Sequence, residues 1–96
     1  MMPIHYDTLP EHDRESMRLY VEHGILPGGF LTACLENNLS EAMVRADKIN
    51  RECLLDIVSF LYNEIPSPAW GSPEKVRQWS MDHQAKRLAK DFHVPR

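Results

Sequence analysis

The chain has 96 residues, is 43% hydrophobic and carries a formal net charge of −3 with its five histidines neutral. This size is typical of one domain with a modest core, and the charge excludes a global positive field that would attract nucleic acid or an anionic membrane. No segment approaches the roughly 20 consecutive apolar residues of a membrane-spanning helix, and the N-terminal stretch lacks a signal-peptide pattern. We therefore expect a cytoplasmic protein with no membrane partner.

The charge is divided unevenly along the chain. Residues 1–72 contain five Lys or Arg and eleven Asp or Glu, a balance of −6, whereas residues 73–96 contain six and three, a balance of +3. We expect a single helical domain over residues 1–96, with residues 1–7 as a flexible lead-in and residues 80–96 as a basic C-terminal extension.

The first predicted helix spans about residues 10–23. Thr8 supplies a hydroxyl N-cap, Pro10 lies in the first turn where its missing N–H costs little, and Glu11 follows the cap by three residues. The apolar side of this helix is a narrow stripe of Met17, Tyr20 and Val21. Gly24 can adopt the left-handed conformation that ends a helix.

The sequence Pro-Gly-Gly at residues 27–29 forms an elbow before a short helix that is expected to end at Asn37 and Asn38. This helix is apolar nearly all round, which indicates burial on most sides; its apolar residues are Phe30, Leu31, Ala33, Cys34 and Leu35. A glycine pair before a helix can bind an anion, but phosphate loops follow a strand and carry a Lys, and neither feature occurs here. We therefore favour a close helix crossing at the elbow, where glycine admits a neighbouring backbone or ring.

The longest predicted element is one amphipathic helix over about residues 39–64. Asn38, with Glu41 three residues later, repeats the capping signal. Apolar residues then recur at steps of three or four, namely Leu39, Ala42, Ala46, Ile49, Cys53, Ile57, Leu61 and Ile65. We expect this ridge to be continuous and inward-facing, so that it supplies the centre of the core and leaves no polar cavity for chemistry.

Two prolines within residues 66–68 end that helix, and Ser-Pro-Glu at residues 72–74 begins the last one. Val76 and Trp79 are its first core anchors. Beyond them the apolar stripe changes phase through Ala85, Leu88, Ala89 and Phe92. Two alternatives remain open: the helix runs to about residue 91 and uses a second face, or the tail is a separate attachment.

No run of residues alternates with the period of a strand. The expected fold is therefore all-α, a small single-domain bundle of about four helices around one long central helix. The reactive residues form no recognisable pattern. Cys34 and Cys53 are expected to be reduced core thiols, the histidines are scattered where zinc needs three or four converging ligands, and no nucleophile has a nearby base. We expect no catalytic, metal or cofactor site, and hence no enzyme.

Protein binding is the favoured use of the surface. The acidic residues that would contact a cationic partner are Glu11, Asp13, Glu15, Glu36, Glu41, Asp47, Glu52 and Asp56, although such charges can also serve solubility alone. We interpret Trp70 as a side chain that packs over one end of the core, and the alternative is a surface anchor for the partner. Nucleic acid is the alternative partner, and its contacts would be Arg77, Lys86, Arg87 and Lys90.

The stretch from Met17 to Trp79 resembles a widespread group of short phage and prophage proteins of unassigned function. The shared landmarks are Tyr20, Glu22, Gly24, Pro27, Phe30, Leu31, Asn38, Leu39, Ala46, Asp47, Asn50, Leu61, Tyr62, Asn63, Trp70, Gly71 and Ser72. This group carries no established chemistry, and the basic tail lies beyond the shared region.

The resemblance implies a small product of a mobile element in the cytoplasm of a bacterial host. Such products commonly bind and block or redirect a host protein, including defence complexes such as CRISPR effectors. We therefore expect a non-catalytic protein that binds and modulates a host protein, with inhibition of host defence as one form of that activity. The alternatives are a nucleic-acid-associated regulator that uses the basic C-terminal segment, and a structural or assembly protein that self-associates, as a dimer for example, through Trp70, Trp79 and Phe92.

Overall fold

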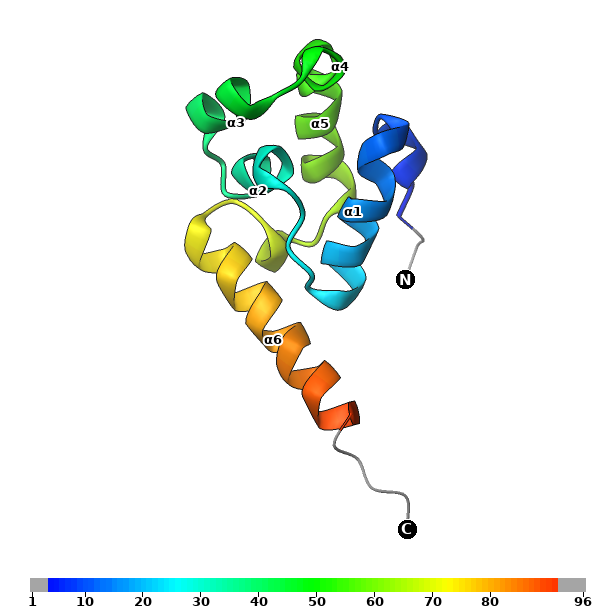
Figure 1. Ribbon diagram of the computed structural model, residues 1–96, viewed down its shortest axis with the longest axis vertical. Helices are drawn as coiled ribbons and strands as arrows, with labels where there is room; N and C mark the ends of the chain where they lie inside the picture. The colour runs from blue at the N-terminus through cyan, green and yellow to red at the C-terminus, as the bar shows by residue number, and fades with distance from the viewer. Residues whose placement is uncertain (1–3, 92–96) are drawn as a thin grey trace.

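The computed structural model describes the backbone of residues 4–91 and the side chains of residues 4–89. In this part of the chain the α-helices are α1 (Glu11–His23), α2 (Gly29–Leu35), α3 (Leu39–Arg45), α4 (Lys48–Glu52), α5 (Leu54–Glu64) and α6 (Pro73–Asp91), and short 3-10 helices lie at Tyr6–Thr8 and Ser67–Ala69 (Figure 1). No strand occurs within the described residues. The expected all-α fold is confirmed.

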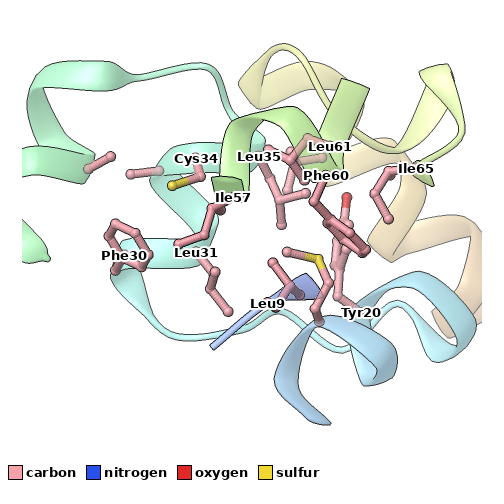
Figure 2. Close-up of a cluster of buried hydrophobic side chains, with 14 of the residues drawn as sticks. Leu9, Tyr20, Phe30, Leu31, Cys34, Leu35, Ile57, Phe60, Leu61 and Ile65 are labelled. Atoms are coloured by element: carbon pink, nitrogen blue, oxygen red, sulfur yellow. The ribbon is translucent and has the colours of Figure 1, made fainter. Parts of the chain in front are cut away.

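The core lies where α1, α2 and α5 meet (Figure 2). Its largest fully buried side chains are Leu9, Met17, Tyr20, Leu35, Ile57, Leu61 and Val76. The Tyr20 hydroxyl donates a hydrogen bond to the Ala69 carbonyl at 2.6 Å. Because a buried hydroxyl without a partner would be costly, this bond both satisfies Tyr20 and holds the 3-10 turn before α6 against α1.

Helix α1 confirms the predicted element at residues 10–23, but it begins differently from the expected capping motif. The Thr8 hydroxyl donates to the His5 carbonyl at 3.1 Å instead of capping α1, and Pro10 occupies the N-cap position. The C-terminal end follows the prediction, since Gly24 has φ 70° and its N–H donates to the Tyr20 carbonyl at 2.8 Å.

The long central helix predicted for residues 39–64 is wrong, because the chain divides there into α3, α4 and α5. Ala46 is extended, with φ −70° and ψ 133°, and the Asp47 carboxylate accepts a hydrogen bond from the Asn50 N–H at 2.8 Å. Asp47 is thus the N-cap of a new helix. A second break falls at Cys53, whose φ of −102° and ψ of 10° depart from helical values.

These breaks interrupt the apolar ridge that was expected to face inward. Leu39 is 63% exposed and Ile49 is 54% exposed, whereas α3 and α4 bury only Ala42 and Asn50. Helix α5 carries the inward face instead, with Ile57, Phe60 and Leu61 buried. The expected bundle of about four helices is therefore six shorter α-helices in the described chain, and the central position belongs to α5 alone.

The close helix crossing occurs at Gly24 and not at the elbow of residues 27–29. A Cβ on Gly24 would lie 2.4 Å from the Cβ of His83 in α6, whereas a Cβ on Gly28 would meet nothing within 4 Å. Gly29 faces the flexible Arg45 side chain, whose Nη1 would lie 2.9 Å from such a Cβ. Gly24 therefore lets α6 approach the end of α1.

Helix α6 begins as predicted, since the Ser72 hydroxyl accepts a hydrogen bond from the Lys75 N–H at 3.2 Å. It continues to Asp91, the first of the two alternatives, and its C-terminal half extends beyond the other helices (Figure 1). The indole of Trp79 donates to the Tyr20 carbonyl at 3.2 Å and the Ser80 hydroxyl donates to the Gly24 carbonyl at 2.7 Å. These bonds fix the N-terminal half of α6 against α1.

Part of the expected lead-in is packed on the domain. Ile4 and Tyr6 contact the core as partly buried side chains, and the His5 N–H donates to the Glu64 carboxylate of α5 at 2.9 Å. Residues 4–7 of the expected lead-in therefore lie against the domain, while residues 1–3 lie outside the described residues. At the other end, the expected extension at residues 80–96 is helical to Asp91, and residues 92–96 are not described.

Candidate functional site

The acidic residues proposed for partner binding do not form one surface. Two of them, Asp13 at the start of α1 and Asp47 at the start of α4, meet on either side of His12. The His12 Nε2 atom lies 3.6 Å from Asp13 Oδ1 and 3.3 Å from Asp47 Oδ2. The two helix starts converge because Asp47 is the N-cap of a separate helix, α4. The prediction of one long helix did not include a helix start at this position.

Asp13 is a buried residue and cannot serve as a contact for a partner. It is 5% exposed, as is Asn50 of α4, and the Asp13 Oδ2 and Asn50 Oδ1 atoms are buried without hydrogen-bond partners. Burial raises the pKa of Asp13, while the charge of His12 and a hydrogen bond from Asn50 oppose that rise. The expected surface role of Asp13 is therefore corrected to a buried polar contact between α1 and α4.

The other acids are spread over the surface. Glu36 and Glu41 line a shallow hollow together with Arg45, whose Nε donates to the Glu41 carboxylate at 2.6 Å. Glu15 is already paired with Arg18 on α1. The remaining three, Glu11, Glu52 and Asp56, are exposed. Burial of Asp13 and the pairing of Glu15 and Glu41 with arginines therefore reduce the acidic charge that the proposed set presents to a partner.

The basic residues proposed for nucleic acid also divide into different roles. Arg77 and Lys86 are exposed on α6. Arg87 donates a hydrogen bond to the His23 carbonyl and so helps to hold α6 on the end of α1. The side chain of Lys90 lies outside the described residues. Among the described side chains, Arg77 and Lys86 are therefore the two of these four cations that are exposed.

Trp70 lies at the edge of a groove between α5 and α6. Its ring is half-buried and packs on the core, and the exposed ring of Tyr62 stands edge-on to it with the centroids 4.9 Å apart and an interplanar angle of 77°. Asn37 and Lys75 complete the polar rim. Both interpretations of Trp70 therefore describe part of its position, since one side of the indole seals the core and the other borders the groove.

A second hollow continues this groove between α3 and α5. It is lined by Leu39, Leu54 and Val58 and shares Asn37 with the first. On α5, Leu55 lies two turns before Tyr62 on the same side. We call this area the aromatic surface and define it as Leu39, Leu55, Val58, Tyr62 and Trp70, with Asn37 and Lys75 at its rim.

Asn37 gives this surface a fixed backbone. It has a φ of 61°, and the following N–H, that of Asn38, donates to the Ala33 carbonyl at 2.9 Å. This is the hydrogen bond of a left-handed helix end, and asparagine tolerates that conformation better than most residues. In addition, the Gly71 N–H donates to the Leu35 carbonyl at 2.6 Å. Backbone hydrogen bonds to the end of α2 therefore hold the segments on both sides of the groove, at Asn37 and at Gly71.

Sequence reasoning identified Trp70 but not the rest of the aromatic surface. Leu55 and Tyr62 were not placed on the predicted core stripe, and they lie opposite Ile57 and Leu61 on α5. Large apolar residues on the polar side of an amphipathic helix are a usable signal of an interaction surface. Leu39 carried no such signal, because it fitted the predicted ridge.

The described residues offer few groups for chemistry. No three His, Cys, Asp or Glu side chains among them converge as a metal site. Both cysteines are free thiols, Cys34 buried as expected and Cys53 only half-buried, and burial raises the pKa of Cys34 to about 11, which keeps it a thiol at neutral pH. Within residues 4–91, no helix combines the length and apolar character that crossing a bilayer requires.

Comparison of this chain with protein-family models, with curated proteins and with solved structures found no match.

Proposed function

We propose that the protein is a non-catalytic binding protein that uses the aromatic surface to contact and modulate a host protein. The observation that carries this proposal is the pair of Tyr62 and Trp70, because Tyr62 is 74% exposed and stands on the half-buried indole. Tyr and Trp are enriched among the residues that dominate binding energy. They combine a large apolar area with a polar group and lose little side-chain entropy on binding.

The surroundings of this pair support a protein as the partner. Leu55 and Leu39 extend the apolar area along α5 and α3, and Asn37 and Lys75 supply a polar rim. An apolar centre with a polar rim is the usual organisation of a protein interface. A nucleic acid would instead require an area rich in Lys and Arg, and Lys75 is the one cation that lines the described groove.

Charge narrows the class of partner. Residues 1–72, which carry all of the apolar part of the aromatic surface, have a net charge of −6. Such a charge accelerates association with a cationic protein and disfavours anionic ones. A host defence complex with a positively charged nucleic-acid channel, such as a CRISPR effector, has this chemistry, and the proposed setting is the cytoplasm of a bacterial host of phage.

Affinity capture from a lysate of the bacterial host tests this proposal. We expect the tagged wild-type protein to retain a stoichiometric host protein, identified by mass spectrometry, that Tyr62→Ala retains at least about tenfold less. The matched control is Ile25→Ala, which removes an exposed apolar side chain elsewhere on the surface and should retain the partner fully. Equal loss in both variants, or recovery of nucleic acid without a stoichiometric protein, would contradict the proposal.

A further inference from the structure

Helix α6 has two apolar faces, and the protein's own core covers only one of them. The covered face contains Val76, Trp79 and His83: Val76 is buried in the core, the Trp79 indole donates to the Tyr20 carbonyl, and His83 lies against Gly24. The other face contains Met81, Ala85 and Leu88. Met81 is 53% exposed, Leu88 is 46% exposed, and Ala85 is exposed between them.

The exposed residues form one stripe on α6, whose C-terminal half extends beyond the other helices (Figure 1). With about 3.6 residues per turn, steps of four and three residues place Met81, Ala85 and Leu88 on one side of a helix. That side is roughly opposite Trp79 and His83. The stripe therefore faces away from the rest of the protein, and no described part of the same chain can cover it.

We propose that a second copy of this chain covers the stripe by pairing with α6 in the antiparallel direction. A two-fold axis between residues 84 and 85 would place Met81 of each copy opposite Leu88 of the other. Ala85 would lie near the axis, where its small side chain lets the two helices approach closely. Large side chains at the ends of the contact and a small one at its centre make the stripe complementary to itself.

The charges beside the stripe favour a second copy in this orientation. Asp82 and Lys86 lie one turn apart on the same flank of α6. An antiparallel copy keeps the two equivalent flanks on one side of the helix pair and brings the acid of each chain within about one residue of the level of the other chain's lysine. A parallel copy in register would place these flanks on opposite sides of the pair, so Asp82 of one chain could not approach Lys86 of the other. Nucleic acid would meet an apolar stripe and the negative charge of Asp82, so this face suits it less well.

In this antiparallel pair the domain of one copy does not overlap the domain of the other. Because Trp79 and His83 contact the end of α1 from the side of α6 opposite the stripe, the two domains would lie on the outer sides of the helix pair. The aromatic surface of each copy would remain free. This inference is therefore independent of the proposed function and can fail without it.

The oligomeric state of the full chain tests the pairing. We expect analytical ultracentrifugation to show a reversible monomer–dimer equilibrium, with a dissociation constant that rises at least about tenfold in Met81→Asp. Ile25→Asp is the matched control and should leave the equilibrium unchanged. Circular dichroism would show that the variants are folded, as their exposed positions predict. A wild-type protein that stays monomeric at the highest soluble concentration, or a dimer that Met81→Asp leaves intact, would overturn the proposal.

Two further variants test the orientation. Asp82→Lys should weaken the dimer, and the double variant with Lys86→Asp should restore it, because the exchanged charges again oppose each other in an antiparallel pair. In a mixture of Met81→Cys and Leu88→Cys chains, mild oxidation should give mainly a disulfide between the two different chains. A predominance of Met81→Cys homodimers would indicate a parallel pair and overturn the proposed geometry.

Discussion

The two halves of the segment from Leu39 to Glu64 have the same apolar periodicity but contribute differently to the domain. Helix α5 inserts Ile57, Phe60 and Leu61 between α1 and α2. By contrast, α3 and α4 bury small or polar residues, Ala42 and Asn50. The difference shows that helical periodicity identifies a face and not its depth of burial, because a large side chain stabilises only where neighbouring elements remove it from water.

A second difference follows from the first. Because α3 and α4 are short and contribute little buried area, they depend on their caps, Asn38 and Asp47, and on local polar contacts. Helix α5 is fixed by core packing on its inner face. We therefore expect the segment of residues 39–52 to open locally before α5 does, and the following predictions separate the two by the size of their effects.

Truncation of a core side chain in α5 should give the largest effect. Leu61 is fully buried, so we expect Leu61→Ala to lower the free energy of unfolding by about 2–5 kcal/mol through lost apolar burial and a residual cavity. The corresponding change in α4, Ile49→Ala, removes a mostly exposed side chain and should cost less than about 0.5 kcal/mol. Urea unfolding followed by circular dichroism measures both. Similar losses in the two variants would show that α4 packs as deeply as α5.

The helices whose ends carry strong local signals are the ones that the sequence predicted well. Gly24 ends α1, and the Ser-Pro-Glu sequence begins α6 close to its predicted start. Between residues 39 and 64 no glycine or proline interrupts the pattern, and the apolar spacing continues across the breaks. The available signal was Asp47 with Asn50 three residues later, a side-chain cap that competes with helix continuation. The prediction followed the apolar periodicity and did not use this capping signal.

The candidate site was less predictable than the fold. Trp70 could be identified because tryptophan is rare and costly to expose, whereas the position of Tyr62 beside it depends on how α5 packs on α2. The burial of Asp13 likewise depends on a distant segment, since its carboxylate lies beside the buried Asn50 of α4. Which surface charges are free and which are buried is set by tertiary contacts between segments distant in sequence, so a list of acids cannot locate a binding face.

Removal of the charge of Asp13 tests the buried polar contact between α1 and α4. Burial raises the pKa of Asp13 above its unfolded value, so its contribution to stability is greatest when it is protonated at low pH and is lost as the pH rises through the folded pKa. A buried oxygen without a partner costs about 1–3 kcal/mol, more than the 0.3–1 kcal/mol that a negative charge typically gains at a helix start. The ionised form should therefore be destabilising.

Asp13→Asn should accordingly raise the free energy of unfolding by about 1 kcal/mol near neutral pH. The new amide can also donate a hydrogen bond toward the orphan oxygen of Asn50. We expect the advantage of the variant over the wild type to shrink as the pH falls to about 4, the ordinary range of an aspartate, because the raised pKa of Asp13 lets the folded wild-type carboxyl gain its proton before that range is reached. Urea unfolding at the two pH values measures this difference. A variant that is less stable than the wild type at both values would show that the Asp13 charge is satisfied in the fold.

Removal of the cap of α4 should give the most local effect. Asp47 accepts the Asn50 N–H at 2.8 Å and pairs with His12 at 3.3 Å, but it is exposed, so we expect Asp47→Ala to cost about 1 kcal/mol. Hydrogen exchange should locate the loss, with amides of residues 48–52 exchanging faster and those of α5 little changed, since α5 is held by its core face. The matched control, Asp56→Ala, removes an exposed acid from the first turn of α5 without removing a side-chain cap. If Asp47→Ala instead accelerated exchange throughout α5, the two helices would open as one unit, and the periodicity they share in sequence would correspond to a shared stability after all.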